Sequence, residues 1–335
     1  MSVSRSIICF GEMLLRLSAS ETDQELISSS HYSSRVAGAE ANVAISLASL
    51  GLQSRMATIL PDNMLGDRAL KTLSDHGVNT GPVVRKPGRM GLFFLNSQIA
   101  GREGGLIYDR EGSAFASAAP DEIDWTKALS NATWLHISGI TAALGEGPLQ
   151  ALHNACTAAK DAGVKISFDC NYRPLLWQYR EQEAPAILAA LAQHADLLFA
   201  GPWDVSLMTG TPQSEEKALD AFESSAEAAF REFPNLAMIA ATSRTIVGSE
   251  HHQLGAHIGT RSGAVHEPPQ TINPVIDRIG SGDAFAAAVL YGVTHDWDAT
   301  RIARFALQAC VMKHAIHGDF SNLNAREVEA ALSAE

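Results

Sequence analysis

Residues 277–285 read Asp-Arg-Ile-Gly-Ser-Gly-Asp-Ala-Phe and lead into a run of small apolar residues. Two glycines two positions apart let the backbone turn sharply and approach a ligand closely. The apolar run predicts a buried helix that begins at about Ser281, and the unpaired N–H groups at a helix start attract anions. Segment 280–283 is therefore predicted to bind an anion, although such a stretch is more often a plain turn with a helix N-cap. Asp283 would repel a phosphate, unless it takes a proton from the group that attacks that phosphate.

Composition limits the class of protein. The chain has 335 residues, 46% hydrophobic and 19% charged, enough for one large α/β domain or two smaller ones. Its net charge of −12 argues against nucleic acid or an anionic membrane as a partner. No apolar run approaches the roughly 20 residues of a membrane span, so we expect a soluble, cytoplasmic protein. Four cysteines without a C-x-x-C pair are expected to be buried thiols: Cys9, Cys156, Cys170 and Cys310.

Apolar strands alternate with helical segments along most of the chain, which predicts an α/β fold with a parallel sheet. Unbroken apolar runs such as 197–199 indicate strands that are buried on both faces. The strands are expected at residues 7–11, 53–60, 133–138, 164–170, 195–200 and 237–242. The helices are expected between segment 36–44 and Gly51, and at 64–76, 146–162, 181–193, 215–232, 281–294, 298–315 and 325–333.

Residues 88–112 depart from this alternation. Two strand-like apolar runs, 91–95 and 106–108, flank the glycine-rich segment 100–105, which predicts a hairpin. Together with segment 14–36, the hairpin is predicted to form a small separate sheet that acts as a lid. Because an exposed sheet invites pairing with a second copy, we expect a homodimer through the lid.

Two arginines follow predicted strands, where ligands of open α/β sheets bind. Arg173 ends the stretch Asp-Cys-Asn-Tyr-Arg at 169–173, and its guanidinium would suit a carboxylate in a fork geometry. Arg110 ends the stretch Tyr-Asp-Arg at 108–110 and is either an exposed strand end or a second arginine for an acidic substrate. Asp and Asn in such stretches are also common in plain turns.

The stretch 277–285 resembles the signature of the ribokinase-like (PfkB) carbohydrate kinases. The resemblance covers nearly the whole chain, and within the family it is greatest to the 2-keto-3-deoxygluconate kinases. Its further segments are Gly38-Ala39-Glu40-Ala41-Asn42, Tyr108-Asp109-Arg110, 134–140 and 169–173. The resemblance implies one ribokinase-like domain over 1–335, a three-layer αβα fold with a β-sheet lid formed by the segments 14–36 and 88–112.

The resemblance also implies a reaction, in which ATP and Mg²⁺ serve to phosphorylate a sugar acid. Asp283 would be the base that takes the proton from the primary hydroxyl of the sugar acid. The N–H groups of Gly280, Ser281 and Gly282 would stabilise charge on the transferred phosphoryl group. Phosphoryl transfer depends mainly on such positioning and charge neutralisation.

Binding residues follow from the same resemblance. Arg110 and Arg173 would hold the substrate, which explains how a protein of net charge −12 binds an acid. The matches to the family's sugar contacts are Gly38, Asn42, Tyr108 and Asp319, although Gly318-Asp319 would equally end a helix. The residues expected near the nucleotide are Asp204, Thr242 and Arg244.

Several positions depart from the family pattern. Ala37-Gly38 stands where a double glycine is usual, and Phe93 stands where some relatives have Tyr. Residues 201–204, Gly-Pro-Trp-Asp, replace a frequent N-x-x-E near Mg²⁺, which leaves the role of Asp204 open. Arg244 either meets a phosphate or is a solvated surface charge.

Other functions remain open at this point. A different acceptor, such as fructose or a deoxy-keto-inositol acid, would also fit the family, although two arginines favour an acid. The altered segment 201–204 suggests a non-catalytic sugar or nucleotide sensor, which the retained Asp283 opposes. A dinucleotide-binding oxidoreductase is disfavoured, because no G-x-G-x-x-G follows the first strand. Histidines without metal-ligand spacing are expected to be surface or core residues: His251, His252, His314 and His317.

Overall fold

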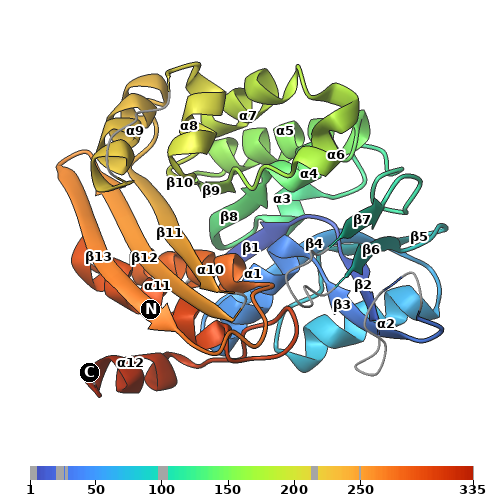
Figure 1. Cartoon of the computed structure of the whole chain (residues 1–335). Coiled ribbons are helices and arrows are strands. Elements are labelled where there is room, and N and C mark those ends of the chain that lie inside the picture. Colours follow the sequence, from blue (N-terminus) through green and yellow to red (C-terminus); the bar gives the residue numbers. More distant parts are fainter. Residues whose placement is uncertain are drawn as a thin grey trace.

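The computed structural model describes residues 6–19, 26, 29–96, 105–212, 218–248 and 250–334. A central sheet of nine strands lies between two layers of helices, and a second sheet of four strands stands beside it (Figure 1). In spatial order, the central strands are β13 (Gly263–Ile272), β12 (His251–Thr260), β11 (Met238–Gly248), β10 (Leu197–Phe199), β9 (Lys165–Asp169), β8 (Ala132–Ser138), β1 (Ser6–Phe10), β4 (Gln53–Pro61) and β5 (Val83–Lys86). Every pair from β11 to β5 is parallel, which confirms the predicted three-layer fold with a mostly parallel sheet.

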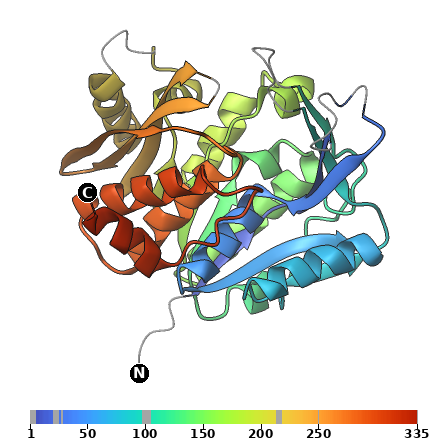
Figure 2. The same ribbon diagram turned by 60° about the horizontal axis from the view of Figure 1, so that its bottom comes forward.

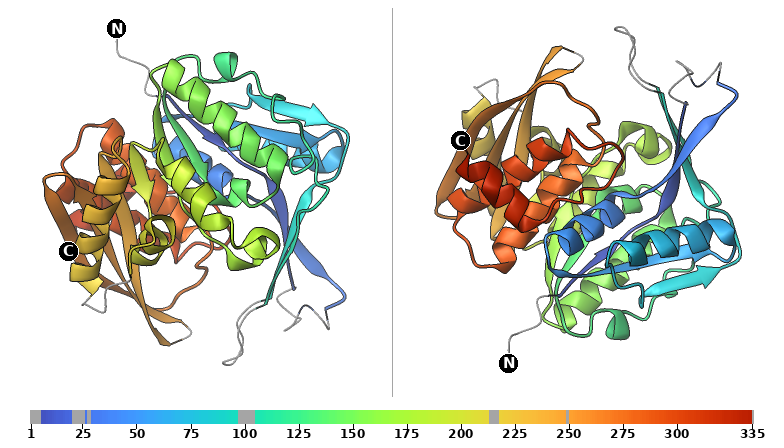
Figure 3. Two further views of the ribbon diagram at one scale, coloured as in Figure 1. Left: turned by 90° about the horizontal axis from the view of Figure 1, so that it is seen from above. Right: turned by 90° about the horizontal axis from the view of Figure 1, so that it is seen from below.

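Helices cover both faces of the central sheet (Figure 3). One layer consists of α1 (Ala39–Ser49), α2 (Met64–Asp75), α10 (Ser281–Thr294), α11 (Ala299–Lys313) and α12 (Ala325–Ser333). The other consists of α3 (Trp125–Ala128), α4 (Gly139–Ala142), α5 (Glu146–Asp161), α6 (Pro174–Trp177), α7 (Ala184–Ala192), α8 (Pro202–Thr209) and α9 (Ala218–Glu232). Alternate side chains of β1 enter the two cores, with Ile7 on the α10 side and Ile8 on the α5 side. Within the described ranges, no helix has both the length and the apolar character to span a bilayer.

The antiparallel edge of the central sheet was not predicted. β11 continues to Gly248, beyond the predicted end at 242, and pairs with β12, which pairs with β13. Pro268 and Pro269 argue against a strand in this part of the sequence, yet proline is tolerated in an edge strand such as β13. Prediction from the unbroken apolar runs of buried parallel strands therefore misses the β12–β13 hairpin.

Two predicted elements are longer than the observed ones, by one to three residues at each end. The helix predicted at 181–193 begins only at Ala184, because a 3₁₀ turn at Gln178–Arg180 and a further turn come first. The strand predicted at 195–200 covers only Leu197–Phe199. Just before this strand, the carboxylate of Asp196 accepts the Ile166 N–H of β9 at 2.8 Å.

The second sheet confirms the small sheet predicted from segments 14–36 and 88–112 (Figure 2). In spatial order, its strands are β3 (Tyr32–Ala37), β2 (Leu14–Ala19), β6 (Gly91–Leu95) and β7 (Leu106–Asp109). β6 and β7 pair antiparallel as the predicted hairpin requires, while most of the glycine-rich segment 100–105 lies outside the described residues. Side chains alternate between the two faces, so Arg16, Phe93 and Tyr108, which are neighbours in register, share one face.

Candidate active site

Helix α10 begins directly after Gly280, whose φ of 79° is strained for residues other than glycine. A Cβ atom at this position would lie 1.9 Å from the carbonyl oxygen of Asp319, so the backbone approach itself also demands glycine. Gly282 is exposed, and a Cβ atom there would meet no atom within 4 Å. The N–H group of Gly282, which has no partner within the helix, thus lies beside an open surface, whereas the N–H of the buried Ser281 donates to the carbonyl oxygen of Arg278 at 3.3 Å.

Asp283, in the first turn of α10, is held by an amide from α1. Asn42 Nδ2 donates to Asp283 Oδ2 at 2.6 Å, and Asn42 is itself buried. Burial raises the pKa of Asp283 to about 6, while the hydrogen bond from Asn42 and the charge of Arg173 oppose the rise. A carboxylate with this pKa is ionised near neutral pH and yet accepts a proton more readily than an ordinary aspartate does.

Two further carboxylates stand at the carboxyl ends of central strands. Asp169 ends β9, and burial raises its pKa to about 8, with the charge of Asp283 as the next cause. Asp204, in the first turn of α8, accepts the Gly201 N–H at 2.8 Å, and burial raises its pKa as well. The charge of Arg173 lowers the pKa of all three carboxyl groups, which places its guanidinium close to the cluster.

The start of α1 is built around a buried carboxylate. Gly38 has a φ of 154°, and a Cβ atom there would lie 2.6 Å from the carbonyl oxygen of Glu12. Glu40 is buried and accepts hydrogen bonds from the hydroxyl groups of Ser138 (2.6 Å) and Thr141 (3.2 Å). These contacts fix the first turn of α1, and with it the amide of Asn42 that reaches Asp283.

The second sheet contributes an aromatic pair and a buried ion pair. Tyr108 stacks on Phe93, with ring centroids 5.4 Å apart. Arg110 is buried, and its Nε donates to Glu12 Oε2 at 2.5 Å. Ser113 donates to the other oxygen of Glu12. Arg110 is thus partly engaged by the protein itself, whereas Arg173 is exposed, and within the described ranges its guanidinium has no hydrogen-bond or ion-pair partner.

Asp319 lies behind the start of α10 in a buried ion-pair network. Arg16 of β2 contacts Asp319 Oδ1 at 2.8 Å and Asp277 Oδ2 at 3.5 Å. Burial raises the pKa of Asp319 to about 6, and the charge of Arg16 opposes that rise. The network ties the second sheet to the two loops that flank Gly280.

On the other side of α10, β11 presents two exposed polar residues two positions apart, Thr242 and Arg244. One Nη atom of Arg244 lies 3.3 Å from Ser281 Oγ and 3.3 Å from His314 Nε2. An exposed guanidinium thus borders the helix start that was predicted to bind phosphate. Within the described residues, no group of three or more His, Cys, Asp or Glu side chains is arranged to hold a metal.

Comparison with protein families matches residues 4–314 to the pfkB family of carbohydrate kinases. This chain belongs to that family. It is 30% identical, over 98% of its length and 97% of the relative's, to a 2-dehydro-3-deoxygalactonokinase of Haloferax volcanii. It is 32% identical to the solved 2-dehydro-3-deoxygluconokinase of Thermotoga maritima, covering 98% of this chain and 99% of that one with a TM-score of 0.92. The crystal structure of an E. coli protein described as a putative ribokinase II, in complex with ATP and Mg²⁺, shares the fold, with a TM-score of 0.81 at 18% identity over 99% and 100% of the two chains.

The pfkB kinase fold brings most of the predicted site residues together around the start of α10. Asn42 and Asp283 are in direct contact, Arg244 reaches Ser281, and Gly280 lies against Asp319. Sequence reasoning did not single out Arg16, Glu12 or Lys313, which hold these residues in place through buried ion pairs and hydrogen bonds. A charged residue inside a strongly apolar strand or helix, such as Arg16 between Leu15 and Leu17, was the available signal.

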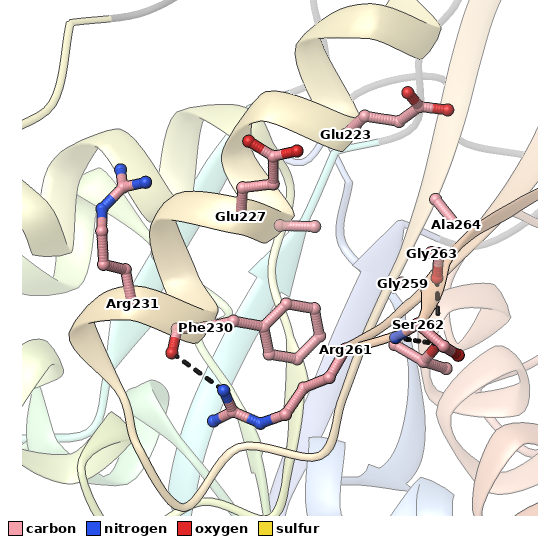
Figure 4. A pocket seen from close by; sticks show the side chains of 11 residues that line it. Glu223, Glu227, Phe230, Arg231, Gly259, Arg261, Ser262, Gly263 and Ala264 are labelled. Carbon is pink, nitrogen blue, oxygen red and sulfur yellow. Dashed lines mark hydrogen bonds between the residues drawn. The ribbon is translucent and has the colours of Figure 1, made fainter.

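A pocket of about 780 Å³ lies away from this cluster, between α9 and the turn that joins β12 to β13 (Figure 4). Arg261 in its wall donates to the carbonyl oxygens of Phe230 (3.3 Å), Leu236 (3.0 Å) and Pro234 (2.8 Å). The guanidinium therefore caps the end of α9, a structural role. None of the predicted site residues lines the pocket.

The two glycines at the start of α10 allow a matched comparison. Gly280→Ala should lower the free energy of unfolding by at least about 1–3 kcal/mol, because it combines backbone strain with a contact to Asp319. Gly282→Ala should stay within about 0.5 kcal/mol of the wild type, because its methyl group enters open space. Urea unfolding of both variants measures the difference. Equal unfolding midpoints would show that Gly280 does not pack as described.

Proposed function

We propose that this pfkB kinase transfers the γ-phosphoryl group of ATP to the primary hydroxyl of a sugar acid, 2-keto-3-deoxygluconate, giving the 6-phosphate. The observation that carries the proposal is Asp283, which sits in the first turn of α10 beside an open glycine and is held by Asn42. The names of the relatives support a keto-deoxy sugar acid as the acceptor. The galactonate epimer is the second candidate, because one of these relatives is named for it.

The proposed chemistry needs a base and an anion site next to each other. Asp283 takes the proton of the primary hydroxyl as the hydroxyl oxygen attacks phosphorus, and ADP leaves. The N–H groups of Gly280, Ser281 and Gly282 stabilise the charge on the phosphoryl oxygens during transfer. Asn42 keeps the carboxylate of Asp283 in one orientation, which supports attack from a fixed direction.

The acceptor is proposed to lie between α1, the second sheet and the loop that carries Asp319. Arg173 binds its carboxylate, because this guanidinium is exposed and near Asp283. Arg110 contributes to binding of the acceptor through the guanidinium N–H groups that are not bonded to Glu12. The remaining proposed sugar contacts are Gly38, Asn42, Tyr108 and Asp319.

The nucleotide is proposed to lie along β11, with Thr242 and Arg244 beside its phosphates. The residues fit Mg²⁺ as well. Burial and the negative charge of Asp283 raise the pKa of Asp169, and a nearby divalent cation would offset this charge repulsion. Mg²⁺ commonly keeps several waters and uses one or two carboxylates together with substrate phosphates, which agrees with Asp204 and Asp169 as its holders. When bound, Mg²⁺ would neutralise phosphate charge.

The enzyme is further proposed to be a homodimer that pairs through the outer face of the second sheet. Leu17, Phe94 and Ile107 are neighbours in register on that face, opposite the face that carries Arg16. Ile107 is 59% exposed and Tyr32, which contacts Phe94 edge to face, is 47% exposed. An apolar stripe of this kind on a small sheet favours pairing with its own copy.

Asp283→Asn should remove turnover and leave the fold intact, because it keeps the shape of the side chain and loses the base. We expect a loss of about 10²–10⁴-fold in kcat by a coupled ADP-release assay, whereas Asp75→Asn, at an exposed position on α2, should match the wild type. For the wild type, kcat/KM should fall as the pH drops through about 6, because protonated Asp283 cannot accept a proton. Retention of more than about a tenth of the activity by Asp283→Asn would refute the assignment.

Arg173→Ala should raise the KM for the sugar acid by roughly 10–100-fold, the loss expected for a charge-assisted hydrogen bond. The KM for ATP should change little. Arg173→Lys keeps the charge without the fork and should be intermediate. A panel of keto-deoxy sugar acids and neutral sugars, including fructose, provides the assay. Equal changes in both KM values would mean that Arg173 does not face the carboxylate.

Ile107→Glu should convert the dimer to a monomer, because a charge would be buried in the apolar stripe. Ile246→Glu is the matched control, since Ile246 on β11 is similarly exposed at 62% but lies outside the second sheet. Light scattering coupled to size exclusion gives the mass of each species. A wild-type monomer, or a dimer unaffected by Ile107→Glu, would exclude this interface.

A further inference from the structure

Lys313, the last residue of α11, is buried with no exposed surface. Its Nζ donates to the carbonyl oxygens of Ile316 at 3.0 Å and Gly318 at 2.8 Å. Lysine is almost never fully buried unless it is paired, because removing an ammonium from water is costly. The surroundings of Lys313 must therefore compensate for its charge.

Carboxylates on neighbouring segments provide this compensation. The charges of Asp277 and Asp319 raise the pKa of Lys313 against the lowering that burial causes. Asp277 also accepts N–H groups from both adjoining loops, from Ile279 at 2.9 Å and from Gly318 at 3.0 Å. The ammonium thus contacts two main-chain carbonyl oxygens, and it lies near two carboxylates that are themselves paired with Arg16. Main-chain carbonyl oxygens are also ligands that proteins offer to a bound alkali cation.

The loop that Lys313 holds is the wall behind the phosphate-binding end of α10. Gly280 packs so closely on Asp319 that a Cβ atom would come within 1.9 Å of its carbonyl oxygen. The N–H groups of Ile276 and Asp277 donate to the carbonyl oxygen of His314, at 2.9 and 3.1 Å. A shift of residues 314–319 would therefore displace Gly280 and the N–H groups that follow it.

A lysine at a helix end can also act as a simple cap, since it interacts favourably with the helix dipole and with the last carbonyl groups. The geometry here is different. Both carbonyl oxygens that Lys313 contacts belong to the loop beyond the helix, three and five residues further along the chain. Its side chain therefore organises the loop, in addition to any effect on the helix.

We propose that Lys313 is a positioning residue for phosphoryl transfer, and that its tethered ammonium takes the place of a soluble monovalent cation behind the start of α10. This inference rests on the proposed kinase function for its catalytic consequence. The ammonium is delivered by the chain itself, so the wild type needs no potassium, sodium or ammonium ion from solution. Removal of the ammonium creates a requirement for such an ion, provided that space is left for it.

Three variants test this proposal, with saturating ATP and sugar acid. Lys313→Ala leaves space for an ion, and Lys313→Met fills the same space without charge. Both should lower kcat by roughly 10–100-fold with little change in either KM, because the anion site is displaced by a small distance. Added ammonium or potassium chloride, at ionic strength held constant with tetramethylammonium chloride, should restore kcat in Lys313→Ala and not in Lys313→Met. Lys71→Met, at an exposed position on α2, is the control and should match the wild type.

Melting temperature gives a second readout that does not depend on activity. Ammonium or potassium should raise the melting temperature of Lys313→Ala relative to tetramethylammonium, and should not raise that of Lys313→Met or the wild type. If the wild type phosphorylates none of the acceptors, the proposed function fails while this readout still decides the cation site.

The wild type keeps the proposal testable even if neither variant folds. Its kcat should be independent of potassium, sodium and ammonium at constant ionic strength. A wild type that requires one of these ions, or a Lys313→Ala variant that responds no more than Lys313→Met does, would overturn the proposal.

Discussion

Burial of like charges next to a helix start is the constraint on which this structure depends. Asp169, Asp283 and Asp319 are all removed from water far enough to raise their pKa values to about 8, 6 and 6. Carboxylates placed so close together destabilise a fold unless cations and N–H dipoles compensate. Arg173 and Lys313 supply the positive charge near Asp283, and the N-terminal end of α10 supplies aligned dipoles.

The same compensation joins the two sheets. Arg16 in the second sheet pairs with Asp319 and Asp277, while Arg110, just after β7, pairs with Glu12 in the connection between β1 and β2. Breaking one partner of such a buried pair leaves the other charge without compensation, which is far more costly than losing a surface ion pair. The second sheet is therefore anchored by charge to the loops around the start of α10, whereas its outer face is apolar. One face of the second sheet thus carries Arg16 and its buried ion pairs, and the other carries an exposed apolar stripe.

Glycine decides where the backbone segments can meet. At Gly280 the positive φ and the approach to Asp319 both exclude a side chain, and at Gly38 the approach to the backbone of Glu12 does the same. Gly282 has no such constraint. Its role in the proposed site is to leave open space next to the helix start, and close packing does not require it. The G-x-G spacing therefore contains two glycines with different physical roles.

The sequence by itself determined the fold class, because buried parallel strands and amphipathic helices leave periodic apolar patterns that local reading detects. It also indicated Asp283 and the glycines before it, since their chemistry depends on neighbours in the chain. Tertiary structure alone decided the rest. The β12–β13 edge was missed because Pro268 and Pro269 are compatible with a strand only at a sheet edge. The ion pairs of Arg16 and Arg110 join segments that are distant in sequence. A charge inside an apolar run, as at Arg16, can signal that such a residue is buried, but the local sequence does not name its partner, because charge compensation in a protein interior depends on three-dimensional neighbours.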